Sequence, residues 1–136
     1  MLSAELGRLS VLCTLLSYQA HVDTRNEYGY TALHLAAEAG HTECVTLLIQ
    51  AKSCLDLPNK FGKTALIVAT ENGHLEIVQE LCQLVTPAVG INIPSRRGFS
   101  PLMIAAVRGD YGVVQCLTAN GADINLENKD KVSFIE

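Results

Sequence analysis

The chain has 136 residues, of which 49% are hydrophobic and 18% charged, and a formal net charge of −4. A mildly acidic chain of this kind gives no general attraction for nucleic acid or for an anionic membrane surface. No apolar run approaches the roughly 18 residues of a membrane span, and the N-terminal stretch, broken by Glu5 and Arg8, lacks the basic start and apolar core of a secretory signal.

The stretch from Gly29 to Gln50 predicts two short helices joined by a tight turn. The Thr31 hydroxyl can cap the first free backbone N–H groups of a helix over residues 32–39, and Gly40 can end that helix at positive φ. After the turn, apolar side chains at helical spacing predict a second helix with one apolar face: Cys44, Val45, Leu48 and Ile49. Helices this short, below roughly 12–15 residues, are marginal alone in water and need neighbours.

Such neighbours occur along the same chain as further copies of the stretch. Residues 62–66 repeat residues 29–33 at an offset of 33, and residues 98–102 repeat them again at a further offset of 36. We place the three extra residues in the segment 84–90, where we expect them to lengthen a helix without breaking the stack. A fixed period in this range signals a stacked array of repeats.

Four segments carry a family resemblance: TALHLAA at residues 31–37, GHTECV at 40–45, GHLEIV at 73–78 and GADIN at 121–125. Together with the period of 33, they resemble the ankyrin repeat and its T-P-L-H-x-A signature. The resemblance implies an all-α fold, an ankyrin-repeat solenoid of stacked helix-turn-helix units with β-turn fingers. The chain departs from the pattern at Ile67 and Met103, which replace the signature His, and at Lys131, which replaces the turn Gly.

The repeats together form a single domain, residues 1–136. We expect a partial repeat over 1–25, full repeats over 26–58, 59–94 and 95–127, and a partial repeat over 128–136. Met1 and Glu136 fall at equivalent repeat positions, and neither end carries the polar face expected of a terminal repeat. We therefore expect a piece of a longer array; the alternative is a short protein with frayed ends.

The five cysteines form no CxxC pair and are expected to be free thiols that serve as small core residues: Cys13, Cys44, Cys54, Cys82 and Cys116. Free thiols indicate a reducing compartment, the cytoplasm or the nucleus. The resemblance assigns His34, His41 and His74 to local hydrogen bonds between turns and repeats. We therefore expect no metal site and no disulfide.

No catalytic arrangement stands out. Thr31 and His34 are the residue types of a nucleophile and base, but they lie one helical turn apart, and the signature assigns them to capping. Each recurring Gly stands alone at a turn, without the clustered Gly and Lys of a phosphate-binding loop. We predict a non-enzymatic chain with no cofactor and no small-molecule substrate.

In the ankyrin family, the fingers and one face of each first helix line a concave surface that binds partner proteins. Four of the seven aromatic residues fall on these fingers, which carry seven basic and three acidic residues between them. Large aromatics and arginines are typical of binding hot spots. The predicted partner-binding residues are Glu27, Tyr28, Tyr30, Glu38, Lys60, Phe61, Lys63, Glu71, Asn72, Arg96, Arg97, Phe99, Val107 and Arg108, and Lys129, Asp130 and Val132 would extend the row.

We interpret the chain as a protein–protein interaction module whose partner is a peptide or surface with acidic and apolar character. One alternative is a structural spacer within a long array. Another is the targeting or substrate-recruiting part of a larger enzyme. A nucleic-acid or phosphoinositide ligand is disfavoured by the acidic residues beside the basic fingers, among them Glu27, Glu38 and Glu71.

Overall fold

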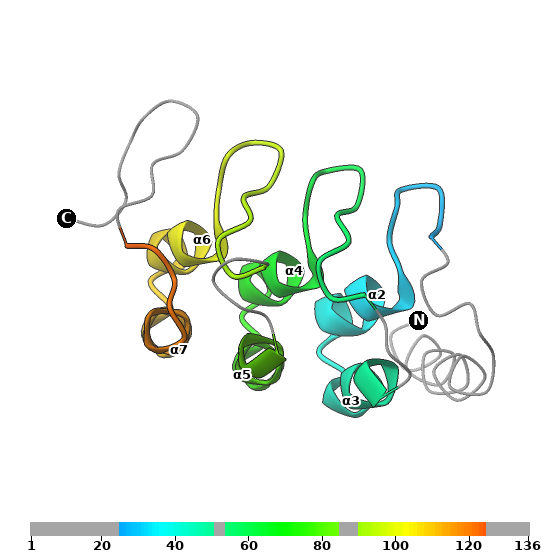
Figure 1. Cartoon of the computed structure of the whole chain (residues 1–136), viewed down its shortest axis with the longest axis horizontal. Coiled ribbons are helices and arrows are strands. Elements are labelled where there is room, and N and C mark those ends of the chain that lie inside the picture. The colour runs from blue at the N-terminus through cyan, green and yellow to red at the C-terminus, as the bar shows by residue number, and fades with distance from the viewer. Residues whose placement is uncertain (1–24, 51–53, 85–89, 125–136) are drawn as a thin grey trace.

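A pair of antiparallel helices repeats three times in the computed structural model, which describes residues 25–50, 54–84 and 90–124 (Figure 1). The predicted helices over 32–39 and after Gly40 are confirmed. The predicted end repeats before residue 25 and after residue 124 lie outside the described part, and so do residues 85–89, within the segment where we place the three extra residues. The pairs are α2 (Ala32–Ala39) with α3 (Thr42–Gln50), α4 (Ala65–Glu71) with α5 (Leu75–Leu84), and α6 (Pro101–Arg108) with α7 (Tyr111–Ala119).

The first helix of each pair begins with the same cap. The side-chain oxygens of Thr31, Thr64 and Ser100 each accept a hydrogen bond at 3.3 Å from the backbone N–H three residues later. An N-cap of this kind satisfies one of the donors that a helix start leaves free. Gly40 and Gly109 end α2 and α6 at φ 79° and 73°, which is the left-handed region.

The helices form two layers, with α2, α4 and α6 in one layer and α3, α5 and α7 in the other (Figure 1). The finger loops rise from the first layer, on the side away from the second. Each helix packs on its partner in the pair and on the equivalent helix of the next repeat. No helix among the described residues is long and apolar enough to cross a bilayer.

Equivalent leucines from successive repeats form the core. Leu33, Leu66 and Leu102 on the first helices are at most 2% exposed, and so are their counterparts on the second helices: Leu48, Leu81 and Leu117. Full burial of one such side chain stabilises the fold by about 2 kcal/mol. Because one core cluster contains residues of all three repeats, each repeat depends on its neighbours for its stability.

The two junctions in the layer of second helices differ. Between α3 and α5, the Thr42 and Thr46 hydroxyls donate to the carboxylates of Glu76 and Glu80, at 3.5 and 2.8 Å. Helix α5 packs more extensively on α7 than on α3. Gly112 stands on α7 where the preceding repeat has Glu76, and a Cβ there would lie 3.3 Å from Leu75 Cδ2, so its missing side chain permits the close approach.

Candidate functional site

Each finger is held in shape by one polar side chain at its start. Asn26 Oδ1 accepts hydrogen bonds from the backbone N–H groups of Tyr28 and Tyr30, both at 2.9 Å. Asn59 repeats this in the second finger with Phe61 and Lys63, at 2.8 and 3.0 Å. Asparagine suits this position because its side chain can hydrogen-bond the backbone two residues on. In the third finger Ser95 Oγ accepts from the Phe99 N–H at 3.4 Å.

Backbone hydrogen bonds join neighbouring fingers into a row. The N–H of Lys60 donates to Tyr28 O, and the N–H of Arg96 donates to Phe61 O, both at 3.0 Å. The turn glycines permit this approach, because a Cβ on Gly62 would lie only 2.5 Å from Arg96 N. The fingers are therefore fixed relative to one another by backbone contacts.

His34 adds a further link between the first two repeats. Its Nδ1 accepts from the Thr31 N–H at 3.1 Å, so its Nε2 carries the proton and donates to Lys63 O at 2.8 Å. Burial lowers the pKa of His34 below its ordinary value, which keeps the ring neutral. The predicted role of the signature histidines is confirmed here and at His74, whose Nε2 bonds Glu38 O at 3.0 Å.

The predicted site residues fall into equivalent rows across the three repeats. The tip row, Tyr28, Phe61 and Arg97, is exposed, with 53% of Tyr28 and 49% of Phe61 open to solvent. Immediately before it lies a second exposed row: Glu27, Lys60 and Arg96. The basic side chains of these two rows form no ion pair with any residue that the structure describes.

The third row, Tyr30, Lys63 and Phe99, is half-buried. The Tyr30 ring packs edge-on against the His34 ring with centroids 5.7 Å apart. Burial, together with the carboxylate of Glu38, raises the pKa of Tyr30. Of the four aromatic residues on the fingers, Tyr28 and Phe61 are therefore exposed, whereas Tyr30 and Phe99 are half-buried.

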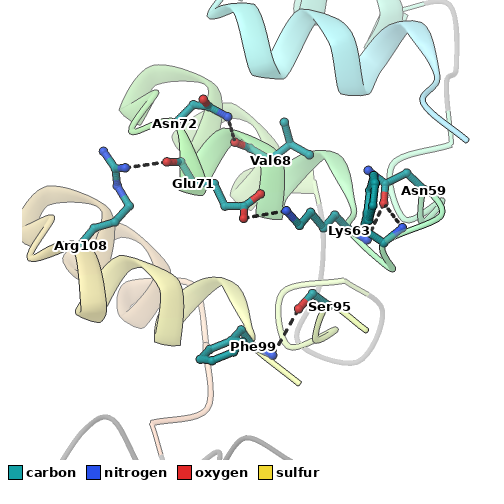
Figure 2. A network of polar contacts seen from close by, with 9 residues as sticks. Asn59, Lys63, Val68, Glu71, Asn72, Ser95, Phe99 and Arg108 are labelled. Atoms are coloured by element: carbon teal, nitrogen blue, oxygen red, sulfur yellow. Dashed lines mark hydrogen bonds and ion pairs between the residues drawn. The ribbon is translucent and has the colours of Figure 1, made fainter. Parts of the chain in front are cut away.

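The ends of the first helices complete the surface, as Figure 2 shows. Lys63 reaches from the second finger to Glu71, with Nζ 2.9 Å from Oε2, and lies 5.8 Å from the centre of the Phe61 ring. Arg108 Nη1 donates to Glu71 O at 2.6 Å, and Asn72 Nδ2 donates to Val68 O at 2.9 Å. Beside them Val107 is 64% exposed.

The predicted residues lie on two parts of the stack: the fingers at residues 26–30, 59–63 and 95–99, and the C-terminal ends of α2, α4 and α6. The Lys63–Glu71 ion pair joins the second finger to the end of α4, and we call the two parts together the finger surface. Lys129, Asp130 and Val132 lie outside the described residues. Sequence reasoning missed the Lys63–Glu71 ion pair and the use of Arg108 as a cap. Neither has a local sequence signal, because both depend on how far apart the folded segments lie.

The described residues contain no group of three or more His, Cys, Asp or Glu side chains that could hold a metal ion. Their four cysteines are free, with Cys44 and Cys82 buried and Cys54 and Cys116 half-buried. The Thr31–His34 pair forms a capping box, in agreement with its predicted role. The exposed side chains of the finger surface include the aromatic Tyr28 and Phe61, the basic Lys60, Arg96 and Arg97, and the apolar Val107.

A family model described as ankyrin repeats (3 copies) matches the chain over residues 1–94 and again over residues 54–128. The two matches cover nearly the whole chain, and the fingers and paired helices agree with it. Ankyrin repeats are generally protein–protein interaction modules. The sequence matches and the repeated structure establish that the chain belongs to the ankyrin-repeat family.

Proposed function

We propose that the chain is a non-catalytic interaction module that binds a partner protein or peptide through the finger surface. One observation carries the proposal: the exposed rings of Tyr28 and Phe61 occupy equivalent positions on hydrogen-bonded fingers, next to exposed Arg96 and Arg97. Exposed aromatic rings are poorly hydrated, and they are the residue types that dominate binding energy when a partner covers them.

The charges of the surface support a partner with acidic character. Lys60, Arg96 and Arg97 stand exposed on the second and third fingers. Lys63 and Arg108, by contrast, are already engaged with Glu71. We therefore assign carboxylate recognition to the first three residues. Arginine suits this task because its planar guanidinium can bind a carboxylate through two parallel hydrogen bonds.

The rigidity of the fingers supports binding without large rearrangement. Asn26 and Asn59 fix the backbone of the first two fingers, and the bonds from Lys60 N and Arg96 N fix each finger on the one before it. A surface ordered before binding loses less conformational entropy when the partner arrives. The apolar Val107 extends the surface from the tips to the end of α6.

The test is selection of a random-peptide display library on the chain, followed by affinity measurement of the enriched peptides. The proposal predicts sequences rich in Asp or Glu and in apolar residues. It also predicts that the Phe61→Ala/Arg97→Ala variant binds them at least about tenfold more weakly, because each anchor contributes on the order of 1 kcal/mol or more.

The matched control is Tyr111→Ala/Gln79→Ala, which removes an aromatic ring and a polar chain from exposed positions on α7 and α5. This control should bind the selected peptides like the unmodified chain. Circular dichroism must show equal helix content in all variants. The proposal would be contradicted if both double variants bound the selected peptides equally weakly. It would also be contradicted if the selection enriched no peptide, which is the result expected of a structural spacer.

A further inference from the structure

A groove of about 640 Å³ opens between α5 and α7, in the helix layer that lies away from the fingers (Figure 1). Its volume is within the range of about 300–1,000 Å³ that is typical of ligand sites. Four of the side chains that line it end in a carboxamide: Gln79, Gln83, Gln115 and Asn120. None of the described residues that line the groove carries a carboxylate, an ammonium or a guanidinium group. The groove is therefore electrically neutral and rich in hydrogen-bond donors and acceptors.

The groove arises from two differences between successive repeats. At the junction of α3 with α5, the long side chains of Glu76 and Glu80 accept hydrogen bonds from two threonine hydroxyls of α3, at 3.5 and 2.8 Å, and so bridge the helices. The equivalent positions on α7 carry Gly112 and Cys116, one without a side chain and the other with a short one. Leu75 of α5 lies beside Gly112, where an added Cβ would be 3.3 Å from its Cδ2. The space that glutamate side chains fill at the first junction is therefore open at the second.

Three of the four carboxamides are available to a ligand. The side chains of Gln79, Gln83 and Gln115 are exposed, and none of them forms a hydrogen bond with any residue that the structure describes. The Asn120 side chain is held in place, because its Nδ2 donates to Cys116 O at 2.7 Å. Both walls of the groove thus present polar groups whose hydrogen bonds a ligand can supply.

We propose that the groove binds an extended, uncharged segment of a partner protein through the peptide backbone of that segment. A carboxamide has a carbonyl acceptor and two N–H donors, so it can bond both the N–H and the C=O of one residue. In an extended chain these two groups point to the same side at every second residue, about 6.7 Å apart. Gln79 and Gln83 stand one turn apart on α5, a rise of about 6.0 Å. Their spacing therefore matches two alternate residues of such a segment.

The other lining residues set the remaining requirements. Gln115 on α7 can bond the residue between those two, whose N–H and C=O point toward the opposite wall. Leu75 offers contact to one apolar side chain. A charged side chain would lose hydration without meeting an opposite charge in the groove, and a proline would lack the N–H that a carboxamide binds. The segment therefore differs in chemistry from the acidic partner proposed for the finger surface.

The experiment selects a random-peptide display library on the full chain, after removal of every peptide that binds the variant Gly112→Glu/Cys116→Glu. This variant carries at both positions the residue of the preceding junction, which closes the groove and leaves the fingers unchanged, so peptides that bind the fingers are removed. We expect the enriched peptides to be uncharged. Gln83→Ala should bind them about tenfold more weakly. The matched control is Gln50→Ala, which removes the equivalent exposed glutamine of α3, outside the groove, and should bind them like the unmodified chain.

N-methylation of single backbone amides in an enriched peptide separates backbone recognition from side-chain recognition. We expect two sensitive positions, two residues apart, each of which weakens binding about tenfold, and Gln83→Ala should abolish the sensitivity at one of them. Circular dichroism checks the folding of every variant, and if Gly112→Glu/Cys116→Glu does not fold, Gln79→Ala/Gln83→Ala takes its place. The proposal is overturned if no peptide is enriched, if Gln83→Ala and Gln50→Ala bind equally well, or if no N-methyl group weakens binding.

Discussion

Replacing Gly62 by alanine tests whether backbone contact between fingers holds the repeats together. Gly62 lies at φ +71°, and a Cβ added there would stand 2.5 Å from Arg96 N and 3.1 Å from Arg96 Cα. Both are backbone atoms of the next finger, so no flexible side chain can move aside. The added methyl group must push the third finger away and stretch the bond between Arg96 N–H and Phe61 O.

The expected loss in the free energy of unfolding has two parts, and the variant Gly109→Ala separates them. Alanine in the left-handed region costs about 1 kcal/mol, and this part applies equally to Gly109, which has φ +73° and no atom within 4 Å of an added Cβ. The clash and the weakened hydrogen bond add about 3 kcal/mol at Gly62 only. We therefore expect Gly62→Ala to lower the free energy of unfolding by about 4 kcal/mol and Gly109→Ala by about 1 kcal/mol.

The assay is urea unfolding followed by circular dichroism, with amide hydrogen exchange at Arg96 as a local readout. Gly62→Ala should speed exchange of that amide well beyond the effect of Gly109→Ala, because only the first change disturbs the bond to Phe61 O. If the two variants lose equal stability, within about 1 kcal/mol, backbone strain explains both and the contact between fingers contributes nothing.

Three further predictions concern pH, capping and salt. Burial lowers the pKa of His34 in the folded chain below 6.5, the value that we take for the unfolded chain. The stabilising contribution of His34 is therefore complete above pH 6.5 and is lost as the pH falls toward the folded pKa. The His34→Ile variant carries the residue found at the equivalent position 67, and unfolding titrations should show that it loses less stability than the unmodified chain over this pH range. Thr64→Ala should cost about 1 kcal/mol in urea unfolding by removing the cap of α4, while Thr64→Ser keeps most of it. Peptides selected on the finger surface should bind more weakly as salt rises from about 0.05 to about 0.5 M, and a flat response would refute pairing with Arg97.

Local chemistry made the helices predictable from the sequence. The cap at Thr31 and the stop at Gly40 each depend on atoms within a few residues, and both lie where the sequence placed them. The exposure of single finger residues was not predictable in this way. Tyr28 and Tyr30 are two positions apart on one finger, yet the turn exposes the first ring and sets the second against His34.

Contacts between repeats show a second limit of sequence reasoning. The carbonyl groups of Glu38 and Glu71 occupy equivalent positions, and each accepts a hydrogen bond from the following repeat. The donors, His74 and Arg108, differ in type and stand at different repeat positions. What recurs is the satisfied carbonyl, not the residue that satisfies it, so comparing aligned residues cannot reveal the contact.

The unequal packing of the second helices has a mechanical consequence. Repeats joined only to their neighbours behave under tension like springs in series, so every junction carries the same force and the weakest one opens first. The first helices contact one another to a similar extent at both junctions, but α5 packs less extensively on α3 than it does on α7. Of the two junctions that the structure describes, the one between α3 and α5 should therefore open first when the stack is pulled, which leaves the second and third repeats together as one unit.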